Sequence, residues 1–187
     1  MSAANKVTIG RILVLPLLIM LLARTGEAER WAALVLFLVA SATDWLDGYL
    51  ARTRGQITKM GKLLDPVADK LLITATLLPL VHRELVSDWM AVLLLGREFL
   101  VSGLRSVASA EGVVIPAGTI GKWKMGASIA ALSFLIVTPP PPAEGAPWRL
   151  PGEVLLWVTL ALSLGSAAQY FYKYRHALRT KPDPAGG

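Results

Sequence analysis

The sequence contains no cysteine, and this absence excludes disulfide bonds, thiolate metal sites and cysteine nucleophiles. Charge is scarce as well: 17% of the 187 residues are charged, whereas a soluble domain of this size usually carries about a quarter. Hydrophobic residues make up 54% of the chain. These proportions indicate a membrane protein.

Six apolar runs approach the length that a helix needs to cross a bilayer, about 20 residues. They cover residues 7–23, 31–51, 63–81, 89–110, 118–137 and 154–172. We therefore predict an all-α, polytopic membrane protein with six transmembrane helices, in which residues 1–187 form a single membrane-embedded domain. The first run could be a cleaved signal peptide, but we favour an uncleaved helix because the later runs supply their own membrane signal.

Positive charge is distributed unevenly between these runs. The N-terminus, the segment between the second and third runs, the start of the fifth run and the C-terminal tail are rich in Lys and Arg, and the alternate loops are not. Because such a bias marks the cytoplasmic side, we expect a multi-pass protein of the inner (cytoplasmic) membrane with both termini in the cytoplasm. We attribute the net charge of +6 to this topology and to anionic substrates, not to nucleic acid.

Four aspartates lie at the cytoplasmic ends of the second and third runs: Asp44, Asp47, Asp65 and Asp69. A charged side chain near the bilayer centre costs at least ~2.5 kcal/mol on insertion scales. The spacings of three and four residues put each pair on one face of its helix. Two adjacent antiparallel helices could therefore direct four carboxylates to one place.

Two divalent cations would balance the four negative charges of this cluster. Oxygen ligands without Cys or His favour Mg²⁺ or Mn²⁺ over Zn²⁺. Two such ions form a clamp suited to phosphoryl transfer. In the alternative, the carboxylates pair with Arg52, Lys62 and Lys70 at the membrane surface. Neither histidine competes as a general base, because His82 falls at the opposite membrane face and His176 in the basic tail.

The segment "DWLDGYLAR" from Asp44 to Arg52, followed by Gly61, Asp65 and Asp69, resembles the signature of the CDP-alcohol phosphatidyltransferases. Every fixed position of that pattern is filled. The resemblance extends to six helices, a cytoplasmic site and the N-terminal "NKVTIGR". It implies transfer of a phosphatidyl group from a CDP-linked lipid to an alcohol with release of CMP, and it suggests a homodimer.

The resemblance also implies roles for individual residues. The metals would be held by all four aspartates, and Asp69 would in addition act as the general base. Gly48, Arg52 and Thr58 would contact the CDP group, with Asn5 and Thr8 nearby. Independently of the resemblance, Gly48 and Ala51 give a small face on which a flat ligand can approach, and Gly61 frees the backbone before the third run. We count all three among the CDP-lipid-binding residues. In the alternative, these small residues serve helix packing.

A second set of cations predicts a phosphate-bearing acceptor. Arg97 and Arg105 lie inside the fourth apolar run, and Lys122 and Lys124 open the fifth. Arginines inside a membrane span suit a bidentate grip on phosphate. In the alternative, Arg97 pairs with Glu98 or Glu84, and the lysines only mark the cytoplasmic interface.

The stretches "GREFLVSGLR" and "GKWKMG" resemble the branch of the family that uses glycerol 3-phosphate. This chain has Met125 where that branch often has threonine. The expected reaction joins the phosphatidyl group of CDP-diacylglycerol to sn-glycerol 3-phosphate and gives phosphatidylglycerophosphate and CMP. The alternative within the family is an inositol phosphate acceptor. Two alternatives belong to other classes of protein. A small cation or proton transporter would use membrane aspartates to bind ions. A structural scaffold would leave the four aspartates unexplained.

Overall fold

The computed structural model describes residues 3–54, 59–110, 119–141 and 146–174, and within these ranges it contains six α-helices and no strand. The helices are α1 (Ala3–Ala23), α2 (Glu27–Arg54), α3 (Lys59–His82), α4 (Asp88–Ala110), α5 (Thr119–Val137) and α6 (Arg149–Tyr174). The prediction of an all-α fold is confirmed. Several helices extend beyond their apolar runs; α2, for example, begins with Glu27 and Glu29 in its first turn, where negative charge stabilises the helix dipole.

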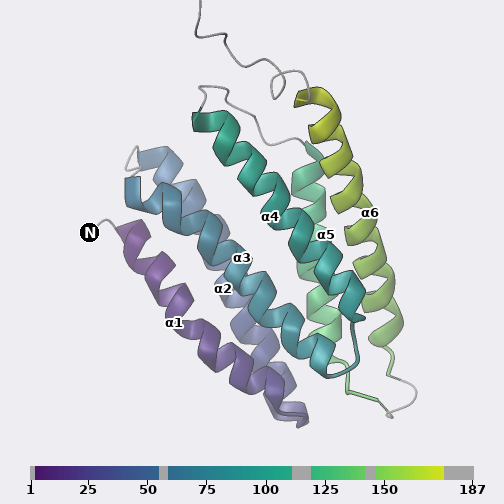
Figure 1. Ribbon diagram of the computed structural model, residues 1–187. Coiled ribbons are helices and arrows are strands. Elements are labelled where there is room, and N and C mark those ends of the chain that lie inside the picture. The colour runs from purple at the N-terminus through teal and green to yellow at the C-terminus, as the bar shows by residue number, and fades with distance from the viewer. Residues whose placement is uncertain (1–2, 55–58, 111–118, 142–145, 175–187) are drawn as a thin grey trace, which may run out of the picture.

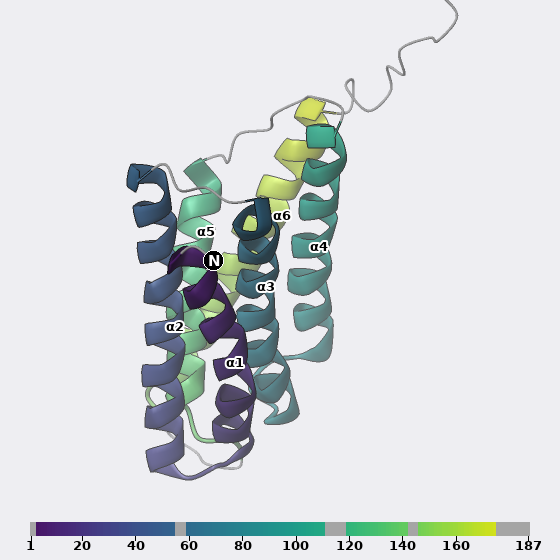
Figure 2. The same cartoon turned by 90° about the vertical axis from the view of Figure 1, so that its left-hand side faces the viewer.

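Successive helices run in opposite directions along one bundle (Figure 1). We call the end at which α2, α4 and α6 finish and α3 and α5 start the upper end, as it is drawn in Figure 1. The view turned by 90° shows the same alternation, with the N-terminal half of α1 beside α2 and α3 (Figure 2). Residues that finish α2 and begin α3 are therefore brought to the same end of the molecule as those that finish α4 and begin α5.

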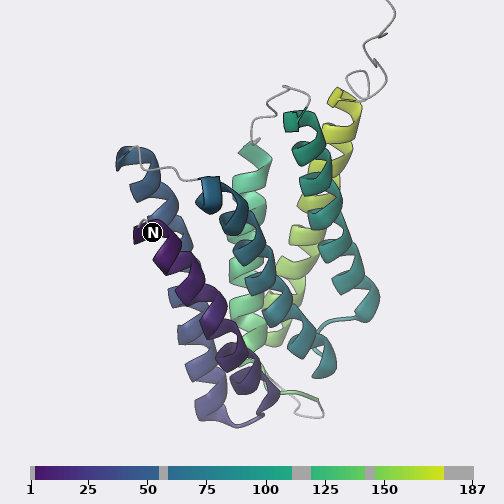
Figure 3. The same cartoon turned by 60° about the vertical axis from the view of Figure 1, so that its left-hand side comes forward.

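Among the described side chains, the most enclosed ones lie along the bundle axis. The most enclosed large side chains are Phe37, Leu18, Leu22, Leu77, Leu80, Leu132, Leu135 and Ile136. The most extensive helix packing is between α5 and α6 and between α1 and α3, with α2 contacting both α1 and α5. In Figure 3, α4 and α6 stand side by side and α5 lies between them and α2. This packing holds α3, α4, α5 and α6 around a shared space.

Close packing of α5 on α6 depends on Gly152 in the first turn of α6. A Cβ atom added there would lie 2.9 Å from Leu135 Cγ and 3.2 Å from Phe134 Cβ. Such distances are shorter than normal van der Waals contact, so only glycine fits without displacing α5. Gly165, further along α6, has nothing within 4 Å of the same added atom.

The surface of the bundle is apolar along most helices. Many large hydrophobic side chains are exposed, among them Leu13, Val35, Val92, Leu100, Leu150 and Tyr172. Within the described ranges one segment, Arg149–Tyr172, is long and apolar enough to cross a membrane by itself, and the apolar segments Thr8–Ala23 and Trp123–Val137 are shorter. Charged side chains interrupt the apolar runs of other helices, for example Arg97 and Glu98 in α4.

Candidate active site

The four predicted metal-binding aspartates belong to two helices that meet at the upper end. Asp44 and Asp47 belong to α2, and Asp65 and Asp69 belong to α3. Only Asp69 has its side chain among the described residues, where it is partly buried and lines a cavity. The described side chains contain no group of three or more metal-binding residues. The predicted quartet thus lies mostly outside the described residues and stays a prediction.

Most residues predicted to contact the CDP-lipid also lie outside the described residues. Thr58 falls in the gap between α2 and α3, and for five others only the helical backbone is described: Asn5, Gly48, Ala51, Arg52 and Gly61. Thr8 is described, and its side chain is buried in α1 with 2% exposure. It lies in the N-terminal part of α1, which neighbours α2 and α3.

A cavity of about 350 Å³ opens between α3, α4, α5 and α6. Its deeper wall is apolar and includes Leu77, Leu94, Leu132 and Leu156. Its wall toward the upper end is polar and charged, with Asp69, Lys70, Ser102, Arg105, Lys124, Ser128 and Tyr170. The cavity therefore combines an apolar interior with a charged mouth, as expected for a ligand that has a polar group and a lipid-like part.

Asp69 and three predicted acceptor-binding cations line this same cavity: Arg97, Arg105 and Lys124. Asp69 was predicted to bind metal and to act as the general base, and the three cations were predicted to bind the acceptor phosphate. The fold brings these two groups of residues to one cavity. Lys122 lies near the start of α5, and its side chain is outside the described residues. Lys70, next to Asp69, also lines the cavity, with its Nζ atom 5.9 Å from the centre of the Phe99 ring.

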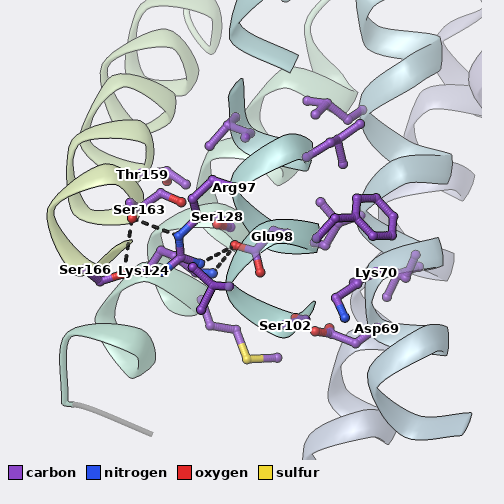
Figure 4. A pocket seen from close by; sticks show the side chains of 18 of the residues that line it. Asp69, Lys70, Arg97, Glu98, Ser102, Lys124, Ser128, Thr159, Ser163 and Ser166 are labelled. Carbon is purple, nitrogen blue, oxygen red and sulfur yellow. Dashed lines mark hydrogen bonds and ion pairs between the residues drawn. The ribbon is translucent and has the colours of Figure 1, made fainter. Parts of the chain in front are cut away.

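Glu98 is the shared partner of two of these cations (Figure 4). Its Oε1 atom accepts a hydrogen bond from Arg97 Nη1 at 2.8 Å and forms an ion pair with Lys124 Nζ. The pairing of Arg97 with Glu98, which was the alternative interpretation of the sequence, is present. Lys124 is likewise paired with Glu98.

Arg97 is buried, with 9% of its surface exposed, and it ties α4 to α6. Its Nε atom donates to the carbonyl of Ser163 at 2.8 Å, and its Nη2 atom donates to the hydroxyl of Ser166. A guanidinium has five N–H donors, so these bonds and the bond to Glu98 leave two for a ligand. Arg97 therefore combines an architectural role with residual capacity to bind an anion.

Arg105 lies two turns further along α4 and is exposed. Its Nη2 atom donates a hydrogen bond of 2.7 Å to the hydroxyl of Tyr170, and the guanidinium carbon lies 5.5 Å from the centre of that ring. No carboxylate among the described residues forms an ion pair with Arg105. Its positive charge is thus available to an incoming anion.

Two hydroxyls of α6 add polar groups to the cavity wall. Thr159 Oγ1 and Ser163 Oγ are buried and have no hydrogen-bond partner within the described part of the chain. A buried hydroxyl without a partner is costly. The cavity wall can therefore still bind water or a polar ligand group next to Arg97.

Sequence analysis did not identify several residues of this site. Glu98 could have been assigned to it, because it follows Arg97 directly and the alternative interpretation already paired them. Tyr170, Ser163 and Ser166 gave no signal, because only the packing of α6 against α4 brings them to the cavity.

Known proteins resemble the chain over most of its length. A family model described as CDP-alcohol phosphatidyltransferase matches residues 1–165. A CDP-diacylglycerol–glycerol-3-phosphate 3-phosphatidyltransferase of Bacillus subtilis (strain 168) is 36% identical over 192 residues, which cover 94% of this chain and 96% of the relative. An enzyme of the same name from Pseudomonas fluorescens is 38% identical over 175 residues, covering 91% and 88% of the two chains.

A relative with a different name is also similar. A cardiolipin synthase (CMP-forming) of Oryza sativa subsp. japonica is 34% identical over 189 residues, covering 93% of this chain and 57% of the relative. The match extends over nearly the whole of this chain in all three relatives.

Proposed function

Since the chain belongs to the CDP-alcohol phosphatidyltransferase family, we propose that it transfers the phosphatidyl group of CDP-diacylglycerol to sn-glycerol 3-phosphate. The products are phosphatidylglycerophosphate and CMP. The names of the Bacillus and Pseudomonas relatives support this acceptor. The observation that carries the proposal is the cavity in which Asp69 shares a charged mouth with Arg105 and Lys124.

In the proposed reaction, the acceptor hydroxyl attacks the phosphorus that carries the diacylglycerol. A new P–O bond forms to the acceptor, and the bond between this phosphorus and the bridging oxygen of the pyrophosphate breaks. CMP leaves with that oxygen. Asp69 accepts the proton of the attacking hydroxyl, the role that the family signature implies for it, and it lines the acceptor cavity.

The acceptor phosphate requires cations on the other side of the same cavity. Arg105 lines this cavity and donates a hydrogen bond to Tyr170, and no carboxylate among the described residues pairs with it. Lys124 and Arg97, which has two remaining donors, line the same cavity. We assign Lys122, near the start of α5, to the same group. Arginine is suited to this role because its planar donors match phosphate oxygens.

We further propose that Asp44, Asp47, Asp65 and Asp69 hold two divalent cations, Mg²⁺ or Mn²⁺. Enzymes of this family generally depend on divalent metals. The donor set is compatible with such ions, because carboxylate oxygens are the ligands they prefer and α2 and α3 bring the four residues to one end of the bundle. When bound, the cations would supply charge stabilisation to the pyrophosphate and the leaving CMP.

The CDP-lipid would occupy the space beside α1, α2 and α3. Seven residues are assigned to it from the family signature: Asn5, Thr8, Gly48, Ala51, Arg52, Thr58 and Gly61. On the side of α3, the described cavity is lined by apolar residues, among them Leu72, Ile73 and Leu77.

The family is membrane-associated, and we propose that all six helices span the inner membrane, with both termini and the upper end in the cytoplasm. The whole chain then forms one membrane-embedded domain. The exposed apolar side chains along the helices support contact with lipid. Several charged residues inside the helices line the cavity, among them Arg97, Glu98 and Lys124. A homodimer is the proposed assembly.

The test is CMP release by the purified protein with Mg²⁺ or Mn²⁺, CDP-diacylglycerol and one acceptor at a time. We expect release with glycerol 3-phosphate and little with inositol phosphate, inositol, serine or phosphatidylglycerol. Preference for inositol phosphate, or for any other of these acceptors, would move the assignment to that acceptor. Ion flux in proteoliposomes without CDP-diacylglycerol, and no CMP release, would favour a transporter.

A further inference from the structure

Glu98 places a carboxylate on the wall of a cavity that is proposed to receive an anion. Negative charge there opposes the acceptor phosphate, so its presence requires an explanation. Only one of its two oxygens is occupied: both cation contacts use Oε1, and Oε2 accepts no hydrogen bond from a described residue.

The unoccupied oxygen faces the interior of the cavity. In Figure 4, the second oxygen of Glu98 points away from Arg97 and Lys124, toward the side on which Ser102 and Asp69 lie. The Glu98 side chain is 28% exposed, so a ligand in the cavity can reach it. The two contacts at Oε1 fix the orientation of the carboxylate, because they come from two different helices, α4 and α5.

We propose that Glu98 Oε2 accepts a hydrogen bond from the middle hydroxyl of the acceptor and thereby selects acceptors that carry a hydroxyl next to the attacking one. This inference rests on the proposed function of the cavity. Glu98 is a binding and specificity residue in it, and the proton of the attacking hydroxyl still goes to Asp69.

The positions of the charges match the order of groups along glycerol 3-phosphate. One terminal hydroxyl must reach Asp69, and the phosphate at the other end requires Arg105 and Lys124. Because Glu98 is bonded to Lys124 and its second oxygen points toward the side of Asp69, it lies between these two ends. A carboxylate can only accept hydrogen bonds, so it favours a hydroxyl at that point and disfavours a carbonyl.

The experiment compares three acceptors with the wild-type protein in the CMP-release assay. The first is sn-glycerol 3-phosphate, the second is 3-hydroxypropyl phosphate, which lacks only the middle hydroxyl, and the third is dihydroxyacetone phosphate, which has a carbonyl there. We expect kcat/KM to be about 10- to 100-fold lower for the hydroxypropyl analogue, the range for losing a hydrogen bond to a charged group. The carbonyl analogue should be at least as poor.

In the variant Glu98→Ala, kcat/KM for glycerol 3-phosphate should exceed that for the hydroxypropyl analogue by no more than about threefold, because the discriminating hydrogen bond is gone. Glu98→Gln keeps an oxygen that can accept this hydrogen bond, so it should retain more of the preference for glycerol 3-phosphate than Glu98→Ala. The matched control is Glu153→Gln, which removes a carboxylate paired with Arg149 outside this cavity and should leave the ratio unchanged. If Glu98 were only a counter-ion for Arg97 and Lys124, its removal would change KM for all acceptors together and keep their ratio.

Two results overturn the inference. One is equal use of glycerol 3-phosphate and either analogue by the wild type, a result that does not depend on any variant folding. The other is an unchanged ratio in Glu98→Ala. Absence of CMP release with glycerol 3-phosphate itself would instead contradict the proposed function, so the two failures are distinguishable.

Discussion

The guanidinium of Arg105 in α4 donates a hydrogen bond of 2.7 Å to the hydroxyl of Tyr170 in α6. The ring of Tyr170 also lies 5.5 Å from the guanidinium carbon. The tyrosine thus orients the arginine, and no carboxylate among the described residues pairs with its positive charge. A hydrogen bond to a neutral hydroxyl suits a cation that must later bind phosphate, since a carboxylate in its place would compete with the ligand.

Replacement of Arg105 by alanine should weaken use of the acceptor more than binding of the CDP-lipid. We expect KM for glycerol 3-phosphate to rise about tenfold or more, because a hydrogen bond to a charged group contributes about 1.5–3 kcal/mol. Tyr170→Phe should raise the same KM by a smaller factor, since it removes the orienting hydroxyl and keeps the charge. Arg149→Ala, at an exposed ion pair outside the cavity, is the control. Equal effects of Arg105→Ala on both substrates would contradict the assignment.

Asp69→Asn should reduce kcat by about 10²- to 10⁴-fold, the usual contribution of a general base. Binding of CDP-diacylglycerol should persist in part, because the other three aspartates remain. Asp88→Asn is the matched control, because Asp88 lies in the first turn of α4 at the opposite end of the bundle. The measurements are single-turnover CMP release and nucleotide-lipid binding. Normal turnover in Asp69→Asn would exclude this residue as the base.

Removal of divalent metal should abolish CMP release. With four carboxylates and no balancing cation, the site repels the anionic pyrophosphate. Chelation followed by dialysis should give inactive protein, and addition of Mg²⁺ or Mn²⁺ should restore the rate. Full activity in the presence of excess chelator would contradict the two-metal proposal and leave the acceptor assignment untouched.

The stability of the α5–α6 pair should depend on Gly152. A methyl group there approaches Leu135 Cγ to 2.9 Å, and overpacking of this kind costs about 1–3 kcal/mol. Gly152→Ala should lower the melting temperature in detergent. Gly165→Ala, on the same helix with open space around it, should be neutral or stabilising, because alanine is about 1 kcal/mol better than glycine in a helix interior. A melting temperature for Gly152→Ala at or above that of the wild type would show that α5 can shift to accommodate the methyl group without loss of stability.

The helices were predictable from sequence because long apolar runs leave little alternative to helical structure. Their ends were less predictable: the second run was expected to start at Trp31, whereas α2 starts at Glu27. Hydropathy detects only the apolar part of a helix. The first turn of α2 is held by acidic residues and the helix dipole.

The cations of the candidate site were predictable from the sequence, but their hydrogen-bond and ion-pair partners were not. Arg97 and Lys124 were identified as anion-binding residues because they are charged residues within or beside apolar runs. That Lys124 of α5 reaches the same oxygen of Glu98 as Arg97 follows only from the packing of the bundle, which places α4, α5 and α6 around one cavity. The same packing brings the hydroxyls of Ser163 and Ser166 to Arg97, and neither serine stands out in an apolar helix.

The most direct test follows the atoms of the acceptor into the lipid. Purified protein in detergent receives CDP-diacylglycerol, Mg²⁺ or Mn²⁺, and sn-glycerol 3-phosphate labelled in its glycerol carbons, and both CMP and lipid-extractable label are measured over time. Phosphatidyl transfer predicts that label enters the lipid phase in a one-to-one ratio with CMP. Release of CMP without label in the lipid, or no release of CMP at all, would contradict transfer to glycerol 3-phosphate.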